Sequence, residues 1–178
     1  LESIAQAFRE IVSVAANDGM VFDAASVSVE EIRKSAGYAG ARVLVSAELA
    51  RARCKTQIDI GFGDAVTPGA QVIVYPSLLD FPAPRLRAYS PETVVAEKLE
   101  ALVSLGMRNS RMKDFFDLWA IAKTFAFKGE TLAEAVAATF TRRRTPFSEA
   151  TPIALTATFA QDASKQAQWA AFLRRTAI

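Results

Sequence analysis

Residues 42–64 read RVLVSAELARARCKTQIDIGFGD, and this stretch contains two runs in which apolar and polar side chains alternate. The first run covers residues 42–49 and the second covers residues 55–62. Alternation with a period of two is typical of β-strands that bury one face. Because only a short basic stretch, 51–54, separates the runs, we predict an antiparallel hairpin.

The residues on either side of this hairpin predict further strands and one helix. Apolar side chains recur at helical spacing over 4–15, and alternation over 21–29 predicts a strand. We expect residues 30–35 to form a short helical or loop excursion before the break at glycines 37–40. Downstream, 72–75 is another strand candidate before a proline-rich loop.

The second half of the chain is predicted to be helical. Ser90 can cap a helix with its hydroxyl, Pro91 suits the first helical position, and Gly106 suits the stop. Further helices are predicted over 109–125, 132–143, 152–159 and 164–175. Strands followed by helices are typical of an α+β protein. We therefore predict a sheet-containing region over 1–89 and a helical bundle over 90–178.

The composition excludes several kinds of chemistry. The chain has no histidine and a single cysteine, Cys54, which excludes Ser–His–Asp and Cys–His catalysis, histidine-ligated zinc and an internal disulfide. Any metal would therefore bind to carboxylates. The net charge of +2 is too small to indicate a nucleic-acid partner by itself. No signal peptide or membrane-spanning run is found, so we expect a cytoplasmic protein without a membrane partner.

Lys98 lies on the wrong side of its predicted helix. On a helical wheel it falls within the apolar arc, close to Val94 and Leu102, while Glu97 and Glu100 fall opposite. One interpretation is a lysine at the rim of the core, with its ammonium in water. The other is a cation directed inward at a carboxylate or an anionic ligand, because a buried lysine is costly unless it is paired.

Asp114 lies at the margin of the buried side of the next helix. Arg111, three residues earlier, could hold it ionised, or Asp114 could simply stabilise the helix N-terminus. Asp117 falls on the polar face, where a surface ion pair with Lys113 explains it.

Asp59 occupies the middle of a predicted strand, opposite Ile58 and Ile60, where aspartate is disfavoured. On a solvated face it needs no explanation, but on the floor of a cleft it would be a metal ligand or a base. Carboxylates with an inward lysine and no histidine suit phosphoryl or nucleotidyl transfer.

Three runs, 55–64, 96–101 and 109–118, resemble the signature segments of the AbiEii/AbiGii nucleotidyltransferase toxin family. Segments 75–90 and 139–145 add to this resemblance, which extends from about residue 42 to the end. The family's fold is that of DNA polymerase β-like nucleotidyltransferases. Its members are toxins of toxin–antitoxin and abortive-infection systems, and some modify the acceptor end of tRNA.

The resemblance implies a role for each unusual residue. Asp59 matches the strand-borne, metal-binding carboxylate of the superfamily, and Lys98 and Asp114 match the lysine and the acid of two helical motifs. It also implies Mg²⁺ and a nucleoside triphosphate as donor, an antitoxin protein as partner, and an RNA acceptor, for example tRNA. The acceptor would be held by basic side chains through phosphate contacts. These side chains are Arg111, Lys113, Arg142, Arg143 and Arg144.

One family motif has no counterpart in this sequence. The family begins with a Gly-Gly/Ser turn and, after a helix, an Asp-x-Asp pair that holds the catalytic metals. Nothing before Asp59 fits, since Asp18, Asp23 and Glu30-Glu31 lack the glycine turn and the spacing. We therefore expect the motif to precede Leu1 and this chain alone to be inactive. The alternative is a degenerate, non-catalytic module that binds an antitoxin or RNA.

Overall fold

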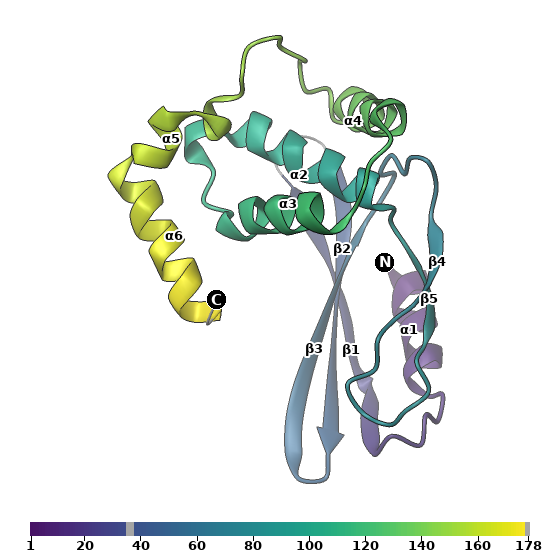
Figure 1. Cartoon of the computed structure of the whole chain (residues 1–178). Helices are drawn as coiled ribbons and strands as arrows, with labels where there is room; N and C mark the ends of the chain where they lie inside the picture. The colour runs from purple at the N-terminus through teal and green to yellow at the C-terminus, as the bar shows by residue number, and fades with distance from the viewer. Residues whose placement is uncertain (35–37, 177–178) are drawn as a thin grey trace. The chain divides into compact units, whose positions relative to one another are not determined.

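The computed structural model describes residues 1–34 and 38–176, which form two compact units (Figure 1). The first unit comprises Leu1–Asp64 and Leu78–Phe81, and the second comprises Ala65–Ser77 and Pro82–Ile178. Of residues 65–89, all but Leu78–Phe81 belong to the second unit.

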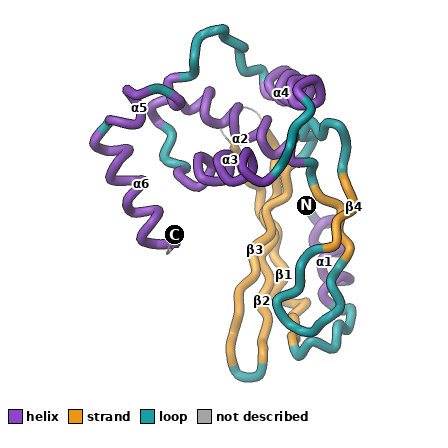
Figure 2. The backbone as a smooth tube through the Cα atoms, in the orientation of Figure 1, coloured by secondary structure: helices purple, strands orange, loops and turns teal. Residues whose placement is uncertain are grey.

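The first unit contains a three-stranded antiparallel sheet in the order β1-β2-β3. Its strands are β1 (Met20–Lys34), β2 (Tyr38–Leu49) and β3 (Ala52–Gly61). The predicted hairpin is confirmed as β2 and β3, which appear as long paired strands in Figure 2. Its turn is shorter than expected, because Leu49 already pairs with Ala52 and Cys54 lies within the ladder.

The predicted excursion at residues 30–35 is wrong as far as residue 34. Strand β1 continues to Lys34, with Glu30 opposite Arg42 and Ile32 opposite Gly40. The strand propensity of this acidic stretch is low, but backbone pairing with β2 outweighs it. The remainder of the expected break, Ser35 to Gly37, lies outside the described residues.

Helix α1 (Glu2–Val12) packs against the sheet and covers its apolar face (Figure 1). The buried residues of this core are Ala5 from the helix and Val27, Val43 and Val45 from the strands. Because side chains alternate along a strand, the polar residues between these positions face the opposite side of the sheet. Asp59 lies on that polar face.

The second unit begins with a two-stranded sheet of β4 (Gln71–Val74) and β5 (Arg85–Ala88). Strand β4 was predicted within one residue, whereas β5 was not predicted. Its four residues, Arg-Leu-Arg-Ala, follow a proline-rich loop and are too few for a periodic signal.

Helices form the rest of the second unit, and this order confirms the α+β class. Helix α2 begins at the predicted cap, since the Ser90 hydroxyl accepts a hydrogen bond from the backbone N–H of Thr93. The predicted helix 152–159 is divided in two, because Thr156 is extended and separates the two pieces. The helical elements are α2 (Pro91–Leu105), η1 (Gly106–Arg108), α3 (Met112–Thr124), α4 (Gly129–Arg143), η2 (Ile153–Leu155), α5 (Ala157–Gln161) and α6 (Ala163–Thr176).

The core of the second unit lies between α2, α3, α5 and α6. Its buried members include Leu102, Met112, Phe159 and Phe172, one from each of these helices. Aromatic rings connect them, with Phe115 of α3 stacked on Phe159 at 5.2 Å between ring centroids. These contacts fix α3 against its neighbours, and α3 carries the acidic residues discussed next.

Candidate functional site

The side chain of Lys98 reaches from α2 to two carboxylates on α3. Its Nζ donates a hydrogen bond of 2.7 Å to Oδ1 of Asp114 and lies 2.7 Å from Oδ2 of Asp117. The exposed fraction of the side chain is 19% for Lys98 and 6% for Asp114. The structure therefore brings Lys98 and Asp114 together in an ion pair, in which Asp114 is buried and Lys98 is half-buried.

Asp117 belongs to the same cluster, and its prediction as a surface residue is incomplete. It does pair with Lys113, at 2.6 Å, but it is only 20% exposed and also binds Lys98. The spacing of Asp114 and Asp117 does indicate that the two carboxylates are neighbours, because residues three apart lie on the same side of a helix. Their shared lysine is on another helix, so periodicity within α3 could not reveal it.

Two further cations flank the carboxylates. Nε of Arg111 lies 2.9 Å from Oδ2 of Asp114, which confirms the predicted i,i+3 contact. This contact is ionic rather than a directed hydrogen bond, because no donor among the described residues is aligned with that oxygen. Arg111 and Lys113 are both largely exposed. With Lys98, the cluster contains three cations and two carboxylates and keeps one net positive charge.

The protonation states follow from these contacts. Burial lowers the pKa of Lys98, but the hydrogen bonds to Asp114 and Asp117 and the charges of both carboxylates raise it by more, so the pKa is raised overall. Burial raises the pKa of Asp117, but the hydrogen bonds from Lys113 and Lys98 outweigh it, and its pKa is lowered. Lys98 is therefore a cation and Asp117 a carboxylate at neutral pH.

A second buried charge cluster joins α2 to α4. Glu100, predicted to lie on the polar face, is instead buried; its carboxylate accepts hydrogen bonds from Arg143, at 2.7 Å, and from Thr145, at 2.6 Å. Arg143 also lies 3.5 Å from Glu97. Packing of α4 on that side of α2 buries a face that the wheel alone marks as polar. The guanidinium of Arg143 is thus held by two carboxylates.

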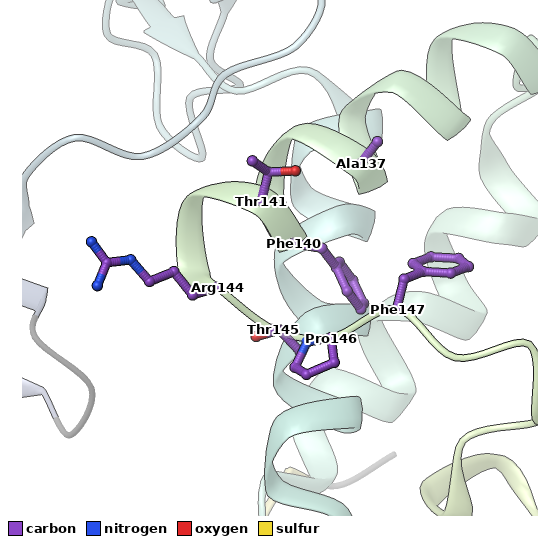
Figure 3. A pocket seen from close by; sticks show the side chains of 7 residues that line it. All are labelled: Ala137, Phe140, Thr141, Arg144, Thr145, Pro146 and Phe147. Carbon is purple, nitrogen blue, oxygen red and sulfur yellow. The ribbon is translucent and has the colours of Figure 1, made fainter.

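Arg142 and Arg144 are exposed at the end of α4. Arg144 has a left-handed backbone, with φ 54°, and borders an open cavity of about 370 Å³. Figure 3 shows its guanidinium extending away from the rings of Phe140 and Phe147, whose centroids are 5.5 Å apart. The cavity is lined by Ala137, Phe140, Thr141, Arg144, Thr145, Pro146 and Phe147.

Asp59 lies in the first unit, in a row of charges across the sheet. Both of its carboxylate oxygens accept hydrogen bonds from Arg42, at 2.8 and 3.0 Å, and Arg42 Nη1 lies 3.8 Å from Glu30. The three residues come from neighbouring strands in register. The hydrogen bond to Asp59 is the main reason that the pKa of Arg42 is raised.

The predicted metal ligand is therefore engaged by an arginine. Among the described residues, no group of three or more carboxylate, cysteine or histidine side chains could hold a metal ion. Mg²⁺ prefers six oxygen ligands, and Asp59 alone would leave the other positions to water, substrate phosphates or further carboxylates. The residues described here do not by themselves make a magnesium site.

The fold and the charge clusters define a small α+β protein whose helices enclose a lysine–aspartate pair. The comparison with family models is more specific: the model "Nucleotidyl transferase AbiEii toxin, Type IV TA system" matches residues 1–177. The chain belongs to this family. The matched region starts at residue 1, whereas the resemblance in the motifs extends only from about residue 42. Searches of curated proteins and of solved structures give no match.

The family assignment carries a partner class with it. A toxin of a type IV toxin–antitoxin system has an antitoxin as its counterpart. A search of the described helices for one long and apolar enough to cross a bilayer finds none.

Proposed function

We propose that the chain contributes the Lys98–Asp114–Asp117 cluster to a nucleotidyltransferase that transfers a nucleotide from a nucleoside triphosphate to RNA, in the cytoplasm. The observation that carries this proposal is the position of Lys98, a half-buried cation held by two carboxylates with two exposed cations beside them. Nucleotidyl transfer depends on positioning and on charge stabilisation at the phosphates, and this cluster supplies both.

In this proposal Lys98 contacts the triphosphate of the donor. Its ammonium is partly accessible and remains charged at neutral pH, so it can attract a phosphate oxygen. Asp114 and Asp117 hold it in place. Arg111 and Lys113, on the exposed side, add to the positive field that a polyanion meets. Asp114 would also be able to orient the hydroxyl that attacks the α-phosphate.

Magnesium is proposed as the cofactor on the basis of the family resemblance and the hard oxygen chemistry of the carboxylates. Asp59 would supply one ligand, and further carboxylates would have to come from an Asp-x-Asp segment. When bound, the ion would offset the charge of the phosphates.

The RNA acceptor is proposed to bind at the end of α4. Arg142 and Arg144 are exposed there and can contact phosphates. Arg143 is less exposed and is held by Glu97 and Glu100. Phe147 is 73% exposed beside the cavity, and exposed aromatic rings stack with unpaired bases. The role predicted for Arg143 is thus less direct, namely to keep this end of the helix in place.

The donor site is tested by isothermal titration of each nucleoside triphosphate with Mg²⁺ into a parent chain that carries the Asp-x-Asp segment ahead of Leu1 and into its Lys98→Met variant. Loss of a charge-assisted contact should weaken binding on the order of tenfold. The matched control is Lys123→Met, in the last turn of α3, which should bind the triphosphate as tightly as the parent does. Equal affinities in Lys98→Met and the parent would exclude Lys98 from the donor site.

Transfer itself is tested with labelled triphosphate and an RNA pool, using a chain that carries the Gly-Gly/Ser and Asp-x-Asp segment ahead of Leu1. Label in RNA that disappears in Lys98→Met supports the transferase.

For the acceptor site, Arg144→Ala should lower the affinity for single-stranded RNA and reduce the salt dependence of that affinity, and Arg174→Ala on α6 is the control. An unchanged salt slope would remove Arg144 from the RNA contact.

A non-catalytic binding module is the second candidate, and one observation favours it. Both carboxylate oxygens of Asp59 accept hydrogen bonds from Arg42, and the described residues contain no cluster of three or more carboxylate, cysteine or histidine side chains that could hold a metal ion. If the chain with the Asp-x-Asp segment binds RNA or an antitoxin but neither binds Mg²⁺–nucleotide nor transfers label, this alternative is the correct one.

A further inference from the structure

Lys165 is a buried lysine on α6 that lies outside the charge clusters described above. Its exposed fraction is 7%, and its ammonium forms no ion pair with any carboxylate in the part of the chain that the structure describes. Lysine is almost never buried to this extent without a partner, because removing its charge from water is costly. The contacts that offset this cost therefore indicate what the side chain does.

Two contacts hold the ammonium. Nζ donates a hydrogen bond of 2.8 Å to the backbone carbonyl of Asn109, and it lies 5.3 Å from the ring centroid of Phe159. The same ring stacks on Phe115, the residue after Asp114 on α3. Both contacts thus lead from α6 to the start of α3.

The position of Lys165 within α6 supports this interpretation. It is in the first turn of the helix, where a positive charge is unfavourable because the backbone N–H groups point toward it. Asp162 satisfies that end of the helix by accepting hydrogen bonds from the N–H groups of Ser164 and Lys165. The helix N-terminus itself does not favour a cation at this position, so the burial of the ammonium is offset by its contacts with the Asn109 carbonyl and the Phe159 ring and by the charge of Asp162.

A continuous chain of contacts connects Asn109 to the candidate site. Asn109 is fully buried, and its Oδ1 accepts a hydrogen bond of 2.8 Å from the backbone N–H of Arg111. Arg111 in turn pairs with Asp114, and Asp114 accepts from Lys98. The turn 109–111 connects η1 to α3, with the N–H of Asn109 bonded to the carbonyl of Gly106 and the N–H of Asp114 bonded to the carbonyl of Arg111. The side-chain contacts of Asn109 and Lys165 add to these backbone bonds and tie the turn to α6.

We propose that Lys165 is a positioning residue: its hydrogen bond to the Asn109 carbonyl holds the turn Asn109–Arg111 in place, and this turn keeps Asp114 in contact with Lys98. Its consequence for catalysis rests on the proposed function, but the positioning itself does not. Without the ammonium, the Asn109 carbonyl loses its buried donor and the turn relaxes. Arg111 and Asp114 then lose their fixed separation, and Lys98 becomes more accessible to solvent.

The experiment uses the ammonium protons of Lys98 as the reporter, observed by NMR on ¹⁵N-lysine-labelled full chain. In the parent, the hydrogen bonds to Asp114 and Asp117 should slow the exchange of these protons with water. In Lys165→Met, which keeps the length but removes the donor, exchange should be faster on the order of tenfold. Lys165→Arg keeps a cation that can reach the carbonyl and should restore most of the protection.

A matched control separates positioning from general loss of stability. Phe140→Leu removes buried contact from α4 and lowers stability without touching α6 or the turn, so Lys98 exchange should match the parent. If Lys165→Met does not fold, Asn109→Ala tests the next contact in the chain and should show the same faster exchange. Parent-like exchange in Lys165→Met, or in Asn109→Ala where only that variant folds, overturns the proposal; so does equally fast exchange in Phe140→Leu.

This readout needs no nucleotide, so it can fail or succeed independently of the transferase. Faster exchange with no triphosphate binding in any variant would keep the positioning role and reject the proposed donor site. Triphosphate binding by the parent together with unchanged exchange in Lys165→Met would do the reverse.

Discussion

The two units each contain an arginine or lysine that bridges two carboxylates, but in different surroundings. In the first unit, Arg42 joins Glu30 and Asp59 on a sheet face, with side chains 33% exposed for Arg42 and 40% for Asp59. In the second, Lys98 joins Asp114 and Asp117 between helices. Exposed ion pairs contribute little to folding stability, whereas breaking a buried pair leaves an unpaired charge that water cannot reach. The same residue types should therefore respond very differently to substitution.

The largest effect is expected for Lys98→Met. Asp114 would remain buried with only the exposed Arg111 as a counterion, and Asp117 would keep only Lys113. We expect the free energy of unfolding to fall by about 3 kcal/mol, as for a broken buried pair. Urea unfolding of Lys98→Met and of Lys123→Met as a control measures this, and a loss as small as that of the control would mean that the pair is effectively solvated.

The double variant Lys98→Met with Asp114→Leu sharpens this result. Replacing both charges removes the uncompensated carboxylate, so the double variant should be more stable than Lys98→Met alone. A double variant that is less stable by the sum of both single losses would show that the two residues contribute independently.

The next largest effect is expected for Glu100→Gln. The amide can still accept from Thr145, but the charge that holds Arg143 is lost. We expect a decrease of about 2 kcal/mol in the free energy of unfolding. Glu97→Gln, which removes a longer and more exposed contact with the same arginine, should cost clearly less; the opposite order would show that Glu97 is the principal partner.

These clusters also show how far the sequence could predict the site. Local patterns correctly indicated the β2–β3 hairpin and the Ser90 cap, because alternation and capping are properties of neighbouring residues. For Lys98, helical spacing marked its place in the apolar arc but left open whether it points inward. The burial of Glu100 and the contact of Asp117 with Lys98 depend on a second helix. Such contacts are set by packing between distant segments, which periodicity within one helix does not report.

Strand β5 and residues 30–34 were missed for the same reason. In both cases the local sequence has only a weak preference for a strand, and hydrogen bonds to a partner strand stabilise the extended backbone. The placement of Asp59 on the polar face was predictable from alternation, but its engagement by Arg42 depends on the register of β2 and β3, which aligns these two residues.

A smaller effect is expected on the acid stability of the second unit. The pKa of Asp117 is lower in the folded protein than its ordinary value of 3.8, so Asp117 contributes stability that is present above that value and lost as the pH falls through the lower folded value. The parent should therefore be more stable than Asp117→Asn near neutral pH by about 1 kcal/mol. Urea unfolding at several pH values should show this difference shrinking below pH about 4; a constant difference would assign it to something other than charge.

The smallest effect is expected for Asp59→Asn, and it completes the comparison between the units. Arg42 would keep Glu30 as a partner and remain in contact with water, so the free energy of unfolding should change very little. The change should shrink further when salt is raised, because exposed pairs are screened. If instead Asp59→Asn costs as much as Lys98→Met, the sheet face is shielded from solvent and the ion pairs of the two units do not differ in stability.

A small stability effect together with loss of Mg²⁺–nucleotide binding, in a chain that carries the Asp-x-Asp segment, would mean that Asp59 exchanges its arginine for the metal. In that case an exposed and inexpensive ion pair is what a ligand-exchanging carboxylate requires, whereas the buried pair of Lys98 is suited to stay in place.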